Sequence, residues 1–127
     1  MFGNTKAFSG FAVSDIVAAR KFYGETLGIT VEDGGMDNIV LNLANGLDLF
    51  VYPKDDHVPA TYTILNFSVD SIDEAVDQLT AKGVEMLRYD GFPQDERGIG
   101  RGKQHNQGPD IAWFTDPAGN VLSLLEE

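Results

Sequence analysis

Two stretches of this chain share one order of hydrophobic and polar positions. Each begins with a short apolar run, passes through a polar pair into a segment with apolar residues at helical spacing, and ends at a glycine followed by another apolar run. Residues 11–29 hold the first copy and residues 67–84 the second. Because strands and helices differ in hydrophobic period, this order predicts a strand, a helix and a further strand in each copy.

Both predicted helices have start and stop signals. A residue of the pair Ser14-Asp15, and one of the pair Asp70-Ser71, supplies a side-chain oxygen for the free amides of the first helical turn. Gly28 and Gly83 then stand where a left-handed residue commonly ends a helix. The apolar stripe is regular in the second copy and looser in the first. Its members are Ile72, Ala75, Val76 and Leu79 in the second copy, and Ile16, Ala19, Tyr23 and Leu27 in the first.

Short β-type runs fill the rest of each half, separated by turns at Gly34-Gly35, Asn45-Gly46 and Ala118-Gly119-Asn120. This order predicts one α+β domain over residues 1–127, built from two βαβββ modules at 7–53 and 61–127 with a polar linker at 54–60. Residues 90–109 are too many for a hairpin turn and are the candidate functional loop. The strands predicted after the helices are Ile29–Glu32, Asn38–Leu43, Leu47–Tyr52, Val84–Arg88, Ile111–Thr115 and Val121–Leu125.

Composition narrows the range of partners. The chain has 127 residues, is 43% apolar, carries a formal charge of −11 and contains no cysteine. A chain this acidic repels phosphate backbones and anionic surfaces, so we expect neither nucleic acid nor a membrane as a partner. Without cysteine there are no disulfides and no thiolate chemistry. No apolar run of signal length follows Met1, and we expect a cytoplasmic protein.

Motifs in both halves resemble a known superfamily. Val13-Ser14-Asp15 followed by Phe22-Tyr23 and Leu27-Gly28, together with the closing Asp116-Pro117-Ala118-Gly119-Asn120, are similar to signatures of the glyoxalase/bleomycin-resistance/dioxygenase (vicinal-oxygen-chelate) superfamily. The resemblance spans nearly the whole chain. It implies two modules whose mixed sheets curl into an open barrel around a ligand cavity, usually completed in a homodimer. Its members include metalloenzymes and proteins that only sequester bleomycin, so it implies a fold rather than a substrate.

The resemblance also implies metal-ligand positions on the first and last strand of each module, usually held by His, Gln or Glu. Here they fall at Phe8, Asp48, Ile64 and Ser123, of which only Asp48 carries charge. A divalent ion needs several such ligands at once to offset its dehydration. The two histidines lie in predicted loops without the spacing of a metal pair. We therefore predict no metal and no other cofactor.

Strand alternation, counted from these positions, predicts the side chains that line the cavity. They are mostly aromatic with few polar groups, which suits a flat or apolar ligand oriented by a few hydrogen bonds. Aromatic residues at inward strand positions more commonly pack as core. The only tryptophan, Trp113, suits a planar or cationic ligand. The candidate ligand-binding residues are Phe8, Asp48, Phe50, Tyr62, Asn66, Ser68, Arg101, Trp113 and Ser123.

Within the long loop, the segment Arg97–Lys103 mixes glycines with basic residues. A phosphate-binding loop would open a helix, and no helix is predicted there. Two interpretations stay open for this segment. It is either a mobile lid whose Arg101 meets an anionic group of the ligand, or a flexible, solvated loop.

Three functions are compatible with these observations. The first is metal-independent binding of a small aromatic or cationic molecule in the barrel cavity, as in the bleomycin-resistance branch. The second is a glyoxalase- or dioxygenase-type metalloenzyme with non-standard ligands, or a metal-free variant that uses Asp48 as a general base. The third is a regulatory or subunit-interaction module whose cavity has closed. Acidity, missing ligands and an aromatic lining favour the first, and whether any reaction is catalysed stays open.

Overall fold

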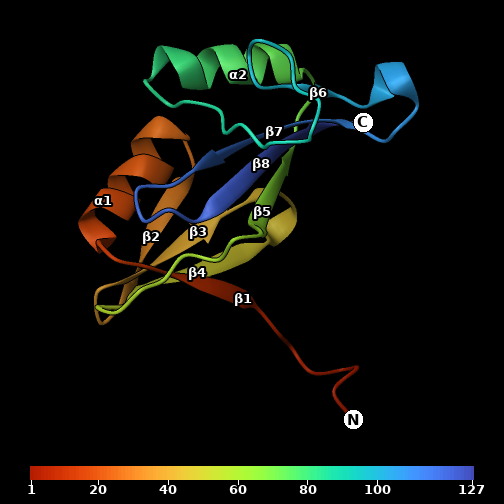
Figure 1. Cartoon of the computed structure of the whole chain (residues 1–127). Helices are drawn as coiled ribbons and strands as arrows, with labels where there is room; N and C mark the ends of the chain where they lie inside the picture. The colour runs from red at the N-terminus through yellow and green to blue at the C-terminus, as the bar shows by residue number, and fades with distance from the viewer. The chain divides into compact units, whose positions relative to one another are not determined.

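The computed structural model describes residues 1–127, which divide into two compact units, Met1–Val58 and Pro59–Glu127 (Figure 1). The first unit has a four-stranded sheet of order β1-β4-β3-β2, in which β1 runs parallel to β4 and the other neighbours are antiparallel. Its elements are β1 (Ser9–Val13), α1 (Ile16–Lys21), the π-helical turn η1 (Phe22–Thr26), β2 (Thr30–Gly35), β3 (Asn38–Asn42), the 3-10 turn η2 (Ala44–Gly46) and β4 (Asp48–Pro53).

The second unit repeats this plan. Its sheet has the order β5-β8-β7-β6, again with one parallel pair, β5 and β8. The fold is therefore α+β with two βαβββ-like modules, as the internal repeat predicts. None of its helices has the length and apolar character needed to cross a lipid bilayer. The elements are β5 (Thr63–Ser68), α2 (Ile72–Ala81), β6 (Gly100–Arg101), the 3-10 turn η3 (Lys103–His105), β7 (Asp110–Thr115) and β8 (Val121–Glu126).

The predicted helix signals are confirmed, and the structure chooses between the paired candidates. Asp15 caps α1, since its Oδ1 accepts from the N–H groups of Val17 and Ala18 at 3.0 and 3.1 Å. Ser71 caps α2, since its Oγ accepts from the N–H of Glu74 at 3.2 Å. Such caps satisfy amides that the first helical turn leaves unpaired.

Each sheet is buried on the face that its helix covers. In the second unit α2 contacts β7 and β8, and its Ile72 and Val76 are buried, as are Phe114 and Leu122 of those strands. The first unit has the same arrangement, with α1 against β3 and β4. Because side chains alternate along a strand, the residues between these core positions lie on the opposite face of the sheet. That opposite face, here called the open face, carries most of the predicted ligand-binding residues.

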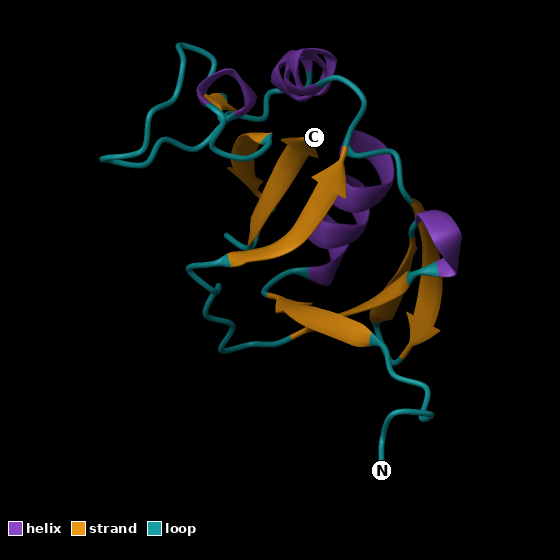
Figure 2. Cartoon of the chain, turned by 90° about the vertical axis from the view of Figure 1, so that its right-hand side faces the viewer, coloured by secondary structure: helices purple, strands orange, loops and turns teal.

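The predicted strand Val84–Arg88 is wrong. The chain is a loop from the end of α2 to β6 (Figure 2), and the fourth strand of the sheet is the short β6. One backbone bond reaches β7, from the N–H of Leu87 to the carbonyl of Trp113 at 2.7 Å. The side chain of Gln94 takes the place of a second strand, because it donates to the carbonyl of Leu87 and accepts from the N–H of Tyr89, both at 2.8 Å. Side-chain bonds of this kind compete with a sheet ladder.

The first hairpin also differs from the prediction. Gly34-Gly35 lies in β2, where the register shifts, and the turn itself is Met36-Asp37. Both turn residues have positive φ, 54° and 65°, which is the geometry of a type I′ turn between twisted strands. The glycine pair therefore forms a bulge rather than the turn.

The turn between β7 and β8 is built around a buried aspartate. Asp116 is 3% exposed. Its Oδ1 accepts from the N–H groups of Ala118 and Asn120, and its Oδ2 from the side-chain amide of Asn120, each at 2.9 Å. Gly119 has φ +88°, a conformation that L side chains rarely adopt. The motif at residues 116–120 therefore acts in the structure of the hairpin.

Candidate ligand-binding site

Three of the predicted residues form a row across the open face of the second sheet. Asn66 of β5 is paired in register with Ser123 of β8, which is paired with Trp113 of β7. Ser123 is fully buried, and its hydroxyl donates to Oδ1 of Asn66. Ser68 lies two residues further along β5, beside Leu125. The row therefore places one indole next to a hydrogen-bonded amide and hydroxyl pair.

Trp113 is the centre of an aromatic cluster that the sequence did not predict. The rings of Tyr89 and Phe92 each stand 5.1 Å from the Trp113 ring, at 90° and 79° to it. Edge-to-face pairs at this distance are favourable and hold the rings in place. Tyr89 and Phe92 precede β6 in the loop, and Phe92 is 43% exposed. The only sequence signal for them was two aromatic residues within a polar segment.

A cavity of about 480 Å³ opens beside this cluster. Trp113 and Ile111 of β7 form one side, and the loop supplies Phe92 and Ile99. A volume of this size falls in the range of small-molecule sites. A Cβ on Gly100 would stand 2.6 Å from the Phe92 ring, so a larger residue there would displace that ring. The complete lining is Phe92, Pro93, Gln94, Asp95, Ile99, Gly100, Arg101, Gly102, Gln104, His105, Gln107, Pro109, Ile111 and Trp113.

The first unit has a smaller aromatic group on its open face. Phe50 lies between Phe8 and Tyr52, with ring centroids 6.2 Å from each. Phe8 is 79% exposed and precedes β1, while Asp48 is exposed at the start of β4. Tyr62, another candidate ligand-binding residue, directly precedes β5 and is 71% exposed. The structure thus brings Phe8 and Phe50 together and leaves Tyr62 outside the rows of its own sheet.

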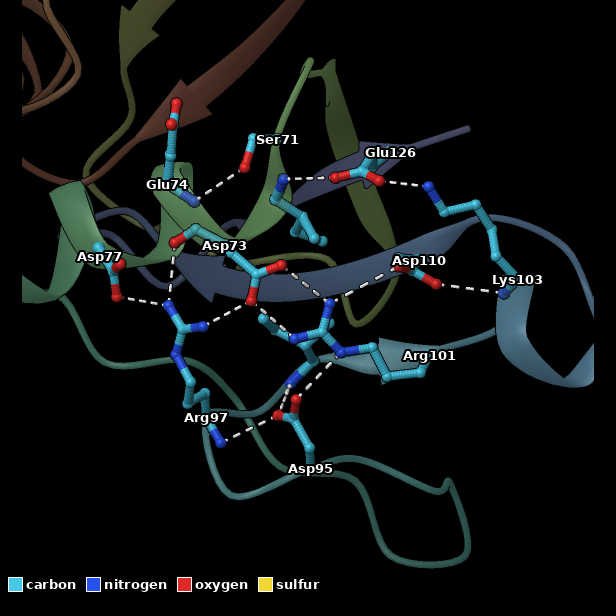
Figure 3. Close-up of polar contacts among 12 residues, drawn as sticks. Ser71, Asp73, Glu74, Asp77, Asp95, Arg97, Arg101, Lys103, Asp110 and Glu126 are labelled. Carbon is cyan, nitrogen blue, oxygen red and sulfur yellow. Dashed lines mark hydrogen bonds and ion pairs between the residues drawn. The ribbon is translucent and has the colours of Figure 1, made fainter.

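Arg101 lines the cavity, but its guanidinium is bound by aspartates of the chain itself (Figure 3). Its Nη1 and Nη2 donate to the carboxylate of Asp73 at 3.1 and 2.7 Å, and its Nε donates to Asp95 at 3.2 Å. Asp110, 6% exposed, stands 3.7 Å away. With these carboxylates around it, the guanidinium does not present a free positive charge to an anionic ligand.

The same network joins the loop to α2. Arg97 donates to the carboxylate and the carbonyl of Asp73 at 2.6 and 2.9 Å, and also binds Asp77. The second oxygen of Asp95 accepts from the N–H groups of Arg97 and Ile99 at 2.9 Å. Instead of a solvated loop, the structure has a segment bound to the first turn of α2 at several points.

A second link reaches the end of the sheet. The ammonium of Lys103 pairs with the carboxylate of Glu126, whose other oxygen accepts from the N–H of Ile72 at 2.8 Å. The N–H of Lys103 donates to Asp110 at 3.1 Å. The turn after β6, the end of β8 and the start of α2 are therefore connected through one chain of polar contacts (Figure 3).

These contacts shift the titration of the carboxyl groups. The hydrogen bond from Arg101 lowers the pKa of Asp73. Partial burial acts to raise the pKa of Asp95, but the N–H groups of Ile99 and Arg97, with Arg101, bring it below its usual value. The hydrogen bond from Lys103 lowers the pKa of Glu126. In each case the folded state holds the charged form more firmly than the unfolded chain does.

The network therefore makes the second unit sensitive to acid. A carboxyl whose pKa is lower in the folded state stabilises the fold above its unfolded pKa, about 4, and this contribution is lost as pH falls through the folded value. We expect the free energy of unfolding, measured in urea by Trp113 fluorescence, to fall steadily below about pH 5. Replacement of Asp73 by Asn should flatten that slope. Equal slopes for the two proteins between about pH 5 and pH 3 would contradict the assignment.

Comparison with known proteins identifies the relatives of this fold. The model of the glyoxalase/bleomycin resistance protein/dioxygenase superfamily matches residues 7–124. The chain belongs to this superfamily. No protein with a curated description matches the sequence.

Solved structures of the superfamily fold match almost the whole chain. FosX, a genomically encoded fosfomycin resistance protein from Listeria monocytogenes, is 17% identical with a TM-score of 0.70, covering 98% of this chain and 93% of its own. TnmS3, an antibiotic binding protein from Streptomyces sp. CB03234, is 21% identical with a TM-score of 0.65, covering 97% of each chain. A superfamily member from Sphaerobacter thermophilus is 24% identical with a TM-score of 0.67, covering 96% of this chain and 98% of its own. At these identities the likeness shows the fold alone.

The metal that some superfamily members use does not fit the residues present here. Phe8 and Ile64 have no ligand atoms, and the hydroxyl of Ser123 is buried in its bond to Asn66. No group of three or more His, Asp or Glu side chains is placed to hold a metal ion. Asp48 alone cannot offset the dehydration of a divalent cation.

Proposed function

We propose that this superfamily member binds a small aromatic or cationic molecule without a metal ion, and that it does so at the cavity beside Trp113. The observation that carries the proposal is the Trp113 cluster, in which two loop rings stand against an indole at the side of a 480 Å³ cavity. Rings that are held in place before binding lower the entropic cost of accepting a ligand.

The network around Arg101 supports a preformed site. Arg97, Arg101 and Asp95 fix the loop that supplies Phe92 and Ile99 to the cavity. Because ion pairs within the chain already hold this wall, ligand binding costs little conformational entropy of the loop. The charge of −11 on the chain also attracts cations toward the surface.

The other predicted residues enter the proposal as contacts of lesser weight. Asn66 and Ser68 supply exposed polar groups on the same open face as Trp113, and the buried hydroxyl of Ser123 holds Asn66 in place. Phe8, Phe50 and Asp48 belong to the first unit and form a separate candidate surface there. A homodimer, the usual assembly that the superfamily resemblance implies, and a cytoplasmic location, inferred from the composition, are part of the same proposal. Size-exclusion chromatography with light scattering at micromolar concentration tests the dimer directly.

The binding proposal is tested with the fluorescence of Trp113, the only tryptophan. We expect saturable quenching by the planar cation 10-methylacridinium or by neutral acridine, in buffer that contains EDTA. By calorimetry, Phe92→Leu should weaken that binding about tenfold, because the ligand loses an aromatic contact, whereas Phe2→Leu at the exposed N-terminus should leave it unchanged.

Two results would overturn the proposal. One is the absence of saturable binding for every aromatic probe. The other is turnover of the hemithioacetal of methylglyoxal and glutathione that appears only when Mn²⁺, Ni²⁺ or Zn²⁺ is added. The second result would instead support a metalloenzyme with unusual ligands.

A further inference from the structure

The turn between β6 and β7 keeps its shape without the side chains at its tip. The carbonyl of Gly102 accepts from the N–H groups of His105 and Gln107 at 3.2 and 2.8 Å. Asn106 takes a left-handed conformation, φ 55°. Gly102 itself has to be glycine, because a Cβ there would stand 2.5 Å from the carbonyl oxygen of Pro109. Backbone bonds therefore fix the turn and leave its side chains available.

Two amides at this tip border the cavity without a protein partner. Gln104 and Gln107 both line the cavity that Trp113 lines, both are exposed, and neither side chain makes a hydrogen bond. A carboxamide offers two donor hydrogens and one acceptor oxygen, and it carries no charge. This separates them from Gln94, whose amide is fully used in holding the loop.

The cations nearest the cavity are already paired. Arg101 is bound by Asp73 and Asp95, and the ammonium of Lys103 by Glu126. The polar groups left for a ligand at this rim are thus the two amides, with the imidazole of His105 between them in sequence. A ligand that used the whole site would place a flat apolar face on the aromatic cluster and a ring edge with donors and acceptors against the amides.

We infer that Gln104 and Gln107 select an uncharged planar heteroaromatic ligand, with hydrogen-bond donors and acceptors on its ring edge, over flat aromatics that lack them. The inference rests on the proposed function and narrows its ligand class. The glutamines are specificity-determining residues in this assignment, and the Trp113 cluster is the platform that any flat ligand uses.

Four tricyclic probes of similar size separate the contribution of edge hydrogen bonds from the contributions of charge and of the flat aromatic face. Lumichrome is neutral with donors and acceptors on its edge, acridine is neutral with a single ring nitrogen, 10-methylacridinium is a fixed cation without donors, and anthracene-9-carboxylate is an anion. We expect lumichrome to bind at least about tenfold more tightly than the other three, a difference that two ordinary hydrogen bonds can supply.

The decisive variant is Gln104→Met with Gln107→Met, which keeps side-chain length and removes both amides. It should weaken lumichrome about tenfold and change acridine by less than about twofold. Gln78→Met, on the exposed side of α2, is the matched control and should change neither. Because backbone bonds hold the turn and the two side chains make no hydrogen bonds, the double variant should fold, which circular dichroism verifies.

Failure of this inference and failure of the proposed function give different results. If acridine and 10-methylacridinium bind as tightly as lumichrome, or if the double variant weakens all probes equally, the selection by the glutamines is overturned while aromatic binding stands. If no probe binds at all, or Phe92→Leu has no effect on any of them, the proposed function itself is overturned.

Discussion

Substitution of Asp116 by alanine is expected to lower the free energy of unfolding by about 3 kcal/mol, because it leaves buried donors without an acceptor. Asp116 is 3% exposed and accepts from two backbone N–H groups and from the side chain of Asn120. Each buried amide that is left unsatisfied costs roughly 1–3 kcal/mol. Urea unfolding followed by Trp113 fluorescence measures the loss, since Trp113 lies in β7.

Two matched variants test whether the acceptor atoms are the cause. Asp116→Asn keeps one acceptor oxygen for the backbone amides and should cost about half as much as the alanine variant. Pro117→Ala, at an exposed position of the same turn, should cost less than about 1 kcal/mol. Equal losses for Asp116→Ala and Pro117→Ala would show that the turn tolerates the missing carboxylate.

The features that were predictable from the sequence are those set by neighbouring residues. Asp15 and Ser71 are capping residues because a short polar side chain bonds amides two or three positions later. Gly83, at φ 84°, follows the end of α2, and Gly28, at φ 71°, follows the π-helical turn that continues α1, for an equally local reason. Repeated in both halves, these signals predict the order of elements and, through it, the superfamily fold.

The missing strand shows where local reasoning stops. Val84–Arg88 has the composition of a strand, but a segment becomes one only if a partner edge is free along its length. Here the side chain of Gln94 bonds the backbone of the segment and holds it in a loop conformation. Gly98 also packs closely against it, since a Cβ at Gly98 would stand 2.7 Å from the Cβ of Met86. Gly100 and Arg101 then occupy the edge of β7. That outcome depends on contacts across a folded loop and has no periodic signal in the sequence.

The candidate site was predictable in part for the same reason. Strand alternation placed Asn66, Trp113 and Ser123 on one face, and the register confirms that row. Tyr89 and Phe92 were missed because loop residues have no period that indicates where they point. Arg101 was identified by residue type. Its main partner, Asp73, is 28 positions away, so the residues near Arg101 in sequence could not show that its charge is paired.

Replacement of Arg101 by methionine is expected to lower the free energy of unfolding by about 2 kcal/mol. The Arg101 side chain is 27% exposed, and its guanidinium is shared by Asp73, Asp95 and the buried Asp110. Removing it leaves carboxylates close together without their cation, and an uncompensated charge is costly where solvent is partly excluded. The expected loss is smaller than for a fully buried ion pair because Asp73 is half-exposed. Urea unfolding at neutral pH measures this loss of free energy.

Arg97→Met is the matched control, because Arg97 pairs with the same Asp73 but otherwise with the well-exposed Asp77. Its loss should be under about 1 kcal/mol, as for surface ion pairs. Asp110→Asn combined with Arg101→Met should recover part of the stability, since it removes the most buried of the orphaned charges. If Arg101→Met instead left stability unchanged but abolished the binding of an anionic probe, Arg101 would act on the ligand. In the network described here it acts on the wall of the cavity, because its charge is already matched within the chain.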